Sequence, residues 1–200
     1  MTARHPALFE GTEMPTAGWW DALWPNPAGV LEAVGLRRDM AAIDLCCGDG
    51  WFTLPMSKVA ASVVAIDIDR NMLEAARDRL AAAGATNCEF VEGDAYELAP
   101  HMRGPADFVL MANAFHGVPD QPRLADAIGK ALKPAGRLAV VNWHQRRREE
   151  TTILGEPRGP KSELRMSPEQ TIASIEAGGL IFAGLVELPP YHYAVIMERP

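Results

Sequence analysis

The sequence predicts an α/β protein with a doubly wound, mostly parallel sheet of seven strands. Short apolar runs rich in branched residues alternate with segments of helical periodicity through most of the chain. The last two runs, LIFAGLVEL and YHYAVIMER, are separated only by a Pro-Pro pair. We therefore expect them to form a hairpin whose terminal strand is antiparallel to the rest.

Seven apolar runs are the predicted strands. They are rich in Val, Ile, Leu and Phe and are bounded by turn-forming residues. Because helical segments separate most of them, the first five are expected to be parallel. In chain order the runs are residues 41–47, 62–67, 88–94, 106–113, 137–143, 180–188 and 191–199.

Helical segments fill most of the intervals between these strands. Their apolar residues recur at three- and four-residue spacing, and capping residues mark several ends. Asn26 and Gly35 are expected to start and stop a short helix, and Ser167 with Gln170 predicts a capping box. The predicted helices lie within residues 19–35, 51–60, 70–83, 122–136 and 167–179.

Composition limits the class of protein. With 19 Lys and Arg against 26 Asp and Glu, the net charge is −7, whereas a broad nucleic-acid interface needs a basic face. The first residues lack the continuous apolar core of a signal peptide, and no apolar run is long enough to span a bilayer. We therefore expect a soluble cytoplasmic protein without nucleic-acid binding or membrane insertion.

The three cysteines do not indicate a metal centre or a disulfide framework. Successive strand residues point to opposite faces, so Cys46 and Cys47 are not expected to bind one ion. The chain has no C-x-x-C or H-x-x-x-H pair of the kind that zinc sites use. Asp44 and Asp49 lie close by in the sequence and would disfavour a reactive thiolate. No metal is expected.

Glycine and polar residues gather where the predicted strands end. Gly48 and Gly50 follow the first strand in IDLCCGDG, where the missing Cβ permits close approach of a ligand. Asp67 ends the second strand and could accept both hydroxyls of a ribose. Asp94 ends the third strand and Asn113 the fourth, and such strand ends surround the ligand in a doubly wound sheet. The ordered series predicts a nucleoside-type cofactor, although the glycine turn alone is equally consistent with tight packing.

A nicotinamide cofactor fits this first turn less well. A pyrophosphate cradle uses G-x-G-x-x-G, and here Cys46, Gly48 and Trp51 occupy the three glycine positions. Tryptophan is the bulkiest residue possible at the last of them. No tyrosine of the chain is followed four residues later by a lysine, the pair that short-chain dehydrogenases need.

Several stretches in order resemble the class I S-adenosylmethionine (AdoMet)-dependent methyltransferases. They are IDLCCGDGWFT, VVAIDIDRNMLEAAR, FVEGDA, and ADFVLMANAFH followed by LKPAGRLAVVNW, and together they cover about residues 40–145. The likeness is to the small-molecule branch that includes quinone-biosynthesis methyltransferases. It implies a Rossmann-like fold, AdoMet as cofactor, S-adenosylhomocysteine as product, and in-line methyl transfer to a small-molecule acceptor.

The resemblance also implies roles for individual residues. Asp44 would order the first turn and reach toward the methionine amino group, and Asn113 would face the methionyl group. Cys46 stands where the family usually has glycine. Ile68, Asp94 and Ala95 would surround the adenine. The implied cofactor-binding residues are Asp44, Cys46, Gly48, Gly50, Asp67, Ile68, Asp94, Ala95 and Asn113.

The expected organisation is a single methyltransferase domain over residues 1–200. We expect an N-terminal helical cap at 1–40, a cofactor-binding core at 41–143, a lid or loop at 144–166, and a C-terminal helix with a strand pair at 167–200.

Candidate acceptor-side residues come from loops beside the strand ends. His116 follows the fourth strand and is predicted to act as a base or substrate hydrogen bond, with a purely structural histidine as the alternative. Arg158 and Lys161 lie in the expected lid and would suit an anionic acceptor. The run RRREE at 146–150 is expected to be a solvated, self-paired loop. The candidate substrate contacts are Trp19, His144, Arg158, Lys161 and Tyr191.

Two other functions stay open from the sequence. Intact cofactor motifs without an identified base are also compatible with a protein that binds AdoMet or S-adenosylhomocysteine and transfers nothing. A nicotinamide-dependent oxidoreductase is the third alternative. The identity of the acceptor, the atom that receives the methyl group and the oligomeric state are not encoded in these patterns.

Overall fold

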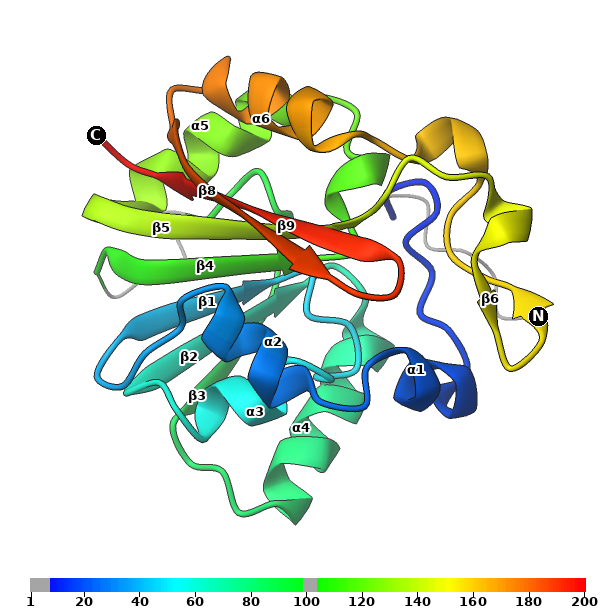
Figure 1. Ribbon diagram of the computed structural model, residues 1–200. Coiled ribbons are helices and arrows are strands. Elements are labelled where there is room, and N and C mark those ends of the chain that lie inside the picture. The colour runs from blue at the N-terminus through cyan, green and yellow to red at the C-terminus, as the bar shows by residue number, and fades with distance from the viewer. Residues whose placement is uncertain (1–7, 99–103) are drawn as a thin grey trace.

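The sheet of this computed structural model, which describes residues 8–98 and 104–200, has the predicted architecture (Figure 1). Its strands are β1 (Ala41–Leu45), β2 (Ser62–Asp67), β3 (Cys88–Glu92), β4 (Ala106–Ala112), β5 (Leu132–Trp143), β8 (Ile181–Leu188) and β9 (His192–Glu198). Within the described residues they form one seven-stranded sheet in the order β3-β2-β1-β4-β5-β9-β8. β1 to β5 pair in parallel, and β9 is antiparallel to both of its neighbours. The predicted fold class is confirmed.

Both faces of the sheet are covered by helices (Figure 1). α5 (Gln121–Ala131) and α6 (Pro168–Glu176) lie on one face, and α2 (Pro27–Ala33) and α3 (Thr53–Ser57) lie on the other. The side chains of β4 alternate between the two faces of the sheet and so contribute to both cores. Val109 and Met111 pack on the α5 side, while Phe108 and Leu110 pack on the α2 side. α4 (Arg70–Ala82) packs Leu73 against Ala65 of β2. This two-sided burial explains why the strands read as continuous apolar runs.

The helix predicted within residues 19–35 is α2, and a second helix precedes it. The Asn26 side chain accepts a hydrogen bond from the Gly29 amide at 3.0 Å, which confirms the predicted cap. α1 (Ala17–Leu23) was not predicted. Pro25 separates the two helices, since proline disfavours helical geometry at the preceding residue and cannot donate a backbone hydrogen bond.

Two helices end earlier than their patterns predict. The helix expected at 122–136 stops at Ala131, and Leu132 already pairs with Ala106 as the start of β5. Pro134 explains the early stop, because it has no amide hydrogen for a helix and restricts Lys133 to extended geometry. α3 covers only five residues of the expected 51–60, and the chain then turns back to enter β2.

The first strand ends at Leu45, before the cysteine pair. Cys46 has φ of 59° and starts the turn, so the assumption that both cysteines continue the strand is wrong. A left-handed backbone at a residue with a side chain is strained by about 1–2 kcal/mol. This strain explains why a glycine would be favoured there.

The segment at 144–166 is more ordered than a plain loop. It contains short 3-10 turns η3 (Arg148–Glu150) and η4 (Ser162–Leu164) and a small hairpin of β6 (Thr152–Ile153) with β7 (Glu156–Pro157). The predicted capping box of Ser167 and Gln170 then starts α6. None of the helices in the described ranges is long and apolar enough to cross a membrane.

Candidate active site

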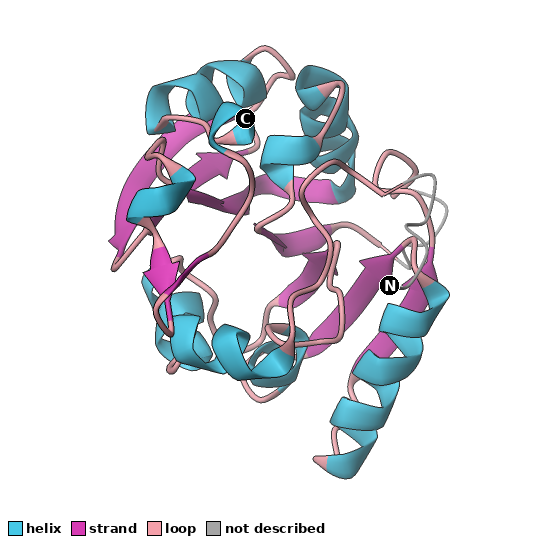
Figure 2. Cartoon of the chain, turned by 90° about the vertical axis from the view of Figure 1, so that its right-hand side faces the viewer, coloured by secondary structure: helices cyan, strands magenta, loops and turns pink. Residues whose placement is uncertain are grey.

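A cavity of about 1340 Å³ opens at the carboxyl ends of the parallel strands. It lies where the strand order reverses between β1 and β4, which is the usual ligand position in a doubly wound sheet. Figure 2 looks at this end of the molecule, where loops and short helices surround the strand ends. Ligand pockets typically measure about 300–1,000 Å³, so this cavity has room for more than one small molecule.

Asp67 is the best-anchored carboxylate of the cavity. Its Oδ2 accepts a hydrogen bond from the Gly48 amide at 2.8 Å, and its Oδ1 accepts one from the Asp69 amide at 2.9 Å. Burial raises the pKa of Asp67 above its ordinary value, and these amide hydrogen bonds oppose the shift. Each carboxylate oxygen has two lone-pair directions, so Asp67 can accept two more hydrogen bonds from a ligand.

The two glycines of the first turn have different roles. Gly48 lines the cavity at φ of 54°, and an added Cβ would lie 3.1 Å from Met14 Sδ. Gly50, at φ of 81°, does not line the cavity, and its added Cβ would lie 3.0 Å from the Ala76 Cβ. The expectation that both admit a ligand is therefore corrected for Gly50, which instead lets α4 pack against the turn.

Asp44 lies inside the first strand and is nearly inaccessible. Its Oδ2 accepts a hydrogen bond from the Thr53 hydroxyl at 2.6 Å. Burial raises the pKa of Asp44 to about 7, with a smaller contribution from the negative charge of Asp67, while the Thr53 bond acts against both. This carboxyl group therefore titrates near neutral pH and would favour a cation beside it.

The adenine-side candidates lie together on one wall. Ile68, Asp94 and Ala95 all line the cavity. The Asp94 side chain is exposed and accepts a hydrogen bond from the Tyr96 amide at 2.9 Å. Tyr96 also lines this wall and makes an edge-to-face contact with Phe9 of the N-terminal segment.

Asn113 is tied to the C-terminal hairpin through His192. Its Oδ1 lies 3.0 Å from His192 Nε2, and its Nδ2 is buried without a hydrogen-bond partner. The His192 ring lies between Trp24 and Trp143, with centroid distances of 4.5 and 4.2 Å. Burial lowers the pKa of His192 well below its ordinary value, so the ring is neutral. Asn113 thus presents a cavity-lining amide whose orientation another strand controls.

His116 lines the cavity from η2 (Phe115–Gly117). Its Nε2 lies 3.1 Å from the Gly11 carbonyl oxygen. Since a carbonyl only accepts, the neutral ring carries its proton on Nε2. Burial is the largest cause that lowers the pKa of His116, so the ring is unprotonated near neutral pH, as a base requires. The Gly11 contact also gives His116 a structural role.

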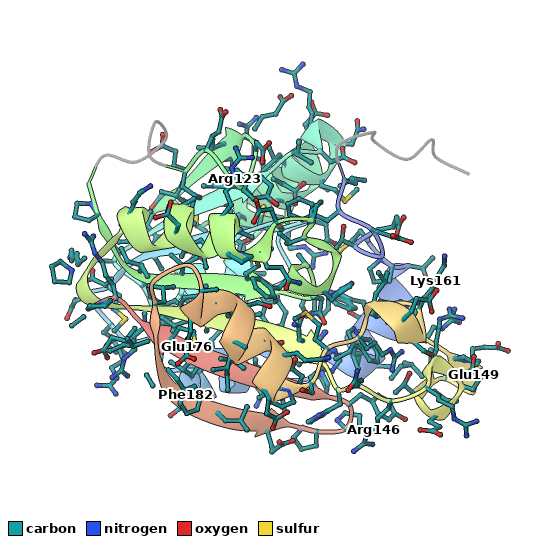
Figure 3. All side chains as sticks on the ribbon, turned by 90° about the horizontal axis from the view of Figure 1, so that it is seen from above. Arg123, Arg146, Glu149, Lys161, Glu176 and Phe182 are labelled. Carbon is teal, nitrogen blue, oxygen red and sulfur yellow. The ribbon has the colours of Figure 1, made fainter. Side chains whose placement is uncertain are left out.

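The opposite side of the cavity is aromatic and basic. Trp19, Trp20 and Trp143 line it, together with Arg148, Arg158 and Lys161 of the 144–166 segment. The Arg158 guanidinium lies 5.5 Å from the Trp19 ring centre, and Lys161 pairs with Glu10 at 3.7 Å. Figure 3 shows Lys161, Glu149 and Arg146 along the same side of the molecule.

Two candidate substrate residues do not reach the cavity. His144 Nε2 lies 2.8 Å from a carboxylate oxygen of Glu187 on β8. The Tyr191 ring stacks on Trp143 and its hydroxyl donates to the Thr152 carbonyl at 3.0 Å. Neither residue lines the cavity. Both placements are corrections, because these side chains pair with neighbouring strands on the outside of the cavity.

The cysteines are not arranged for nucleophilic chemistry. Burial raises the pKa of Cys46 and of Cys47 well above the ordinary value, and Asp44 and Asp67 add to both shifts. Both thiols are therefore protonated at neutral pH. Among residues 8–98 and 104–200, no group of three or more His, Cys, Asp or Glu side chains is placed to hold a metal ion.

Several cavity residues were not predicted from the sequence. The N-terminal segment 8–15 crosses the cavity, and Arg148 turns inward from the predicted self-paired run. Only Arg147 of that run forms the expected pair, with Glu150 at 2.7 Å. Of the missed residues, only Tyr96 could have been found from the sequence, because it lies two positions after Asp94. The other residues reach the cavity through contacts with segments that are distant in the chain.

Comparison with known protein families finds a match over residues 42–136, the part of the chain that contains β1 to β4. Residues 42–136 match a family model described as "Methyltransferase domain". The chain is 34% identical over 119 residues to demethylmenaquinone methyltransferase from Staphylococcus aureus (strain MRSA252), which covers 58% of this chain and 48% of that protein. It thus spans about half the length of the curated relatives it matches.

Solved structures share the fold over nearly the whole chain. An S-adenosylmethionine-dependent methyltransferase from Aquifex aeolicus superposes with a TM-score of 0.75 at 23% identity, covering 88% of this chain and 90% of that one. The [4+2]-cyclase SpnF superposes with a TM-score of 0.74 at 16% identity, covering 97% and 88%. These comparisons agree with the resemblance seen in the sequence: residues 42–136 match a methyltransferase domain, and at these identities the solved structures show a shared fold.

Proposed function

We propose that this protein transfers a methyl group from AdoMet to a small-molecule acceptor. The observation that carries the proposal is that one cavity has two unlike sides. Its strand-end side carries Asp44, Asp67 and Asp94, which suit a cofactor with a sulfonium and an amino group. Its other side is aromatic and basic, and the volume leaves space there for a second molecule.

The strand-end residues fit the cofactor. Asp67 keeps free lone pairs for two ribose hydroxyls, and Asp94 is exposed to the cavity beside Ala95. The buried Asn113 Nδ2 has no protein partner and could donate to the methionyl carboxylate. Gly48 removes the Cβ that would project from the turn. When bound, AdoMet supplies an activated methyl group on a sulfonium.

The remaining task of the protein is to orient the acceptor and to exclude water. Segments 8–15 and 144–166 cover the cavity from two sides, consistent with the proposed cap and lid. His116 is the proposed base for an acceptor that must lose a proton, and the lone pair of its neutral form is on Nδ1, which is buried without a hydrogen-bond partner. Arg158 and Lys161 support an acceptor that carries negative charge.

Two alternatives make different predictions. A protein that only binds AdoMet or S-adenosylhomocysteine would show affinity without turnover, and the likeness to a cyclase illustrates that this fold also carries other chemistry. A nicotinamide oxidoreductase would bind NADH in preference to AdoMet. Acceptor screening that follows S-adenosylhomocysteine release separates the first alternative from a transferase.

Calorimetric titration with AdoMet, S-adenosylhomocysteine and NADH tests the cofactor assignment. We expect micromolar binding of the first two and none of NADH. Asp67→Ala should weaken S-adenosylhomocysteine binding about 100-fold, because two charge-assisted hydrogen bonds are lost. Asp78→Ala, an exposed carboxylate on α4, is the matched control and should bind normally. Equal affinity of the Asp67→Ala variant and the wild type would refute the site.

A further inference from the structure

Beside the basic side of the cavity, the guanidinium groups of Arg148 and Arg165 converge on one short stretch of chain, residues 158–160. Arg148 Nε donates to the Gly159 carbonyl at 3.0 Å. Arg165 donates to the Arg158 carbonyl at 2.9 Å and to the Pro160 carbonyl at 3.1 Å. Residues 158–160 are thereby held against the Trp143 ring, where an added Cβ at Gly159 would lie 2.8 Å from the ring. The Arg158 side chain therefore starts from a rigid backbone.

Arg148, Arg158 and Arg165 form no close ion pair with a carboxylate within residues 8–98 and 104–200. The hydrogen bonds of Arg148 and Arg165 in these ranges go to carbonyl and hydroxyl oxygens. Arg165 is only 3% exposed, and its Nη1 is buried without a partner. The Nε of Arg158 is also buried and unpartnered, and Arg158 lines the cavity. A cation without an anion beside it is unfavourable in a buried or half-buried position unless a ligand supplies one, and Arg148 and Arg158 are half-buried.

The nearby acidic residues do not supply this anion. Glu10 forms an ion pair with Lys161. The charge of Glu13 acts on His116, where it partly opposes the lowering of the pKa by burial. In the 146–150 run, Glu150 pairs with Arg147 at 2.7 Å, and the exposed Glu149 only partly offsets the lowering of the Arg165 pKa by burial and by Arg148. The unmatched positive charge of this side therefore faces the cavity at Arg158 and Arg148.

The unpartnered polar atoms of the cavity wall are mainly donors. Buried polar groups in native proteins are nearly always hydrogen-bonded, so exceptions in a cavity wall indicate what a ligand must offer. The indole Nε1 atoms of Trp20 and Trp51 join Asn113 Nδ2 and Arg158 Nε in this set. Asn113 Nδ2 is assigned above to the cofactor, whereas Arg158 Nε suits an acceptor oxygen of a second molecule, and the Trp19 and Trp143 rings offer flat apolar surfaces on the same side of the cavity.

We propose that Arg158, supported by Arg148, binds an oxyanion of the acceptor, and that the acceptor is a flat aromatic acid. The proposal rests on the proposed function, because it names the substrate class of the same cavity. Arg165 acts as a positioning residue through the Arg158 and Pro160 carbonyls. The aromatic ring of the acceptor lies against the tryptophans, and its acid group reaches the guanidinium groups, for which Arg is better suited than Lys.

The test uses full-length protein saturated with S-adenosylhomocysteine and three probes: benzoate, phenyl phosphate and the neutral isostere benzamide. In wild type, benzoate or phenyl phosphate should bind at least about 10-fold more tightly than benzamide. Arg158→Met keeps the aliphatic stem and should remove this preference while benzamide and S-adenosylhomocysteine bind as before. Arg147→Met, which changes an exposed outward pair, is the matched control and should keep the preference.

The outcomes separate the two proposals. Equal affinity for the acids and benzamide, no measurable acid binding, or equal effects of the Arg158 and Arg147 variants would overturn the oxyanion site. If the wild type does not bind S-adenosylhomocysteine, the proposed function fails instead. The preference for the acids over benzamide is then measured in the absence of S-adenosylhomocysteine. Tighter binding of phenyl phosphate than of benzoate would support the oxyanion site and assign it to phosphate.

Discussion

The two sides of the cavity differ in how their residues are held in place. On the strand-end side, Asp44 lies in β1, Asp67 ends β2 and Asn113 directly follows β4. All three lie within the matched residues 42–136. On the basic side, Trp19 and Arg158 come from segments outside that match. The first side depends on strand geometry, and the second on contacts between distant loops.

This difference separates a shared part of the site from one particular to this chain. Backbone amides hold Asp67, so almost any sequence with this turn reproduces the geometry. Arg158 is placed by Arg165, by Gly159 against Trp143 and by stacking on Trp19. Cofactor binding is therefore expected to tolerate changes in the loops, whereas acceptor choice should not.

The largest expected effect is a loss of stability, and it should differ between the two glycines of the first turn. Gly50→Ala should lower the free energy of unfolding by about 3 kcal/mol, from left-handed strain and from overpacking against Ala76. In a chain of this size that corresponds to roughly 6–12 °C in Tm. Gly48→Ala has only the flexible Met14 end nearby, so it should lose less stability but bind S-adenosylhomocysteine more weakly. Equal Tm losses with equal binding would contradict the distinction.

The second prediction concerns the buried Asp44. Its folded-state pKa of about 7 exceeds the ordinary value of 3.8, so the folded state binds an extra proton between those values. The contribution of Asp44 to stability is therefore present at low pH and lost as pH rises toward 7, by roughly 2 kcal/mol between pH 5.5 and pH 7. Asp44→Asn keeps the Thr53 hydrogen bond and removes the titration.

Denaturant unfolding of both proteins at several pH values measures this difference. The Asn variant should gain stability relative to wild type as pH rises through this range. Parallel pH profiles for the two proteins would show that Asp44 does not titrate there. The same ionisation should strengthen AdoMet binding as pH rises toward 7, because the ionised carboxylate attracts the cationic cofactor.

The smallest effect is expected at Cys46. Cys46→Gly should stabilise the fold by about 0.5 kcal/mol, because relief of the left-handed strain exceeds the greater chain entropy that glycine has when unfolded. Cys46→Ala keeps the Cβ at the same φ and should bring no gain. Thermal unfolding of the pair measures the difference, and a glycine variant less stable than the alanine variant would contradict this account.

The acceptor-side predictions show where sequence reasoning stops. Arg158 and Lys161 reach the cavity, but His144 and Tyr191, equally close to strand ends in the sequence, turn toward β8 and the β6–β7 hairpin. Residues 8–15 carried no signal for their position at all. Side-chain direction in these segments depends on partners that lie far away in sequence.

The sequence by itself determined the sheet, the capping box that starts α6 and the order of polar strand ends, because periodicity, turn chemistry and the geometry of parallel strands act locally. Only the tertiary structure decided that Gly50 allows α4 to pack against the first turn, that His192 orients the Asn113 side chain, and that Arg148 faces the cavity. Each of these depends on packing between segments distant in the chain, and neither residue type nor spacing specifies such contacts.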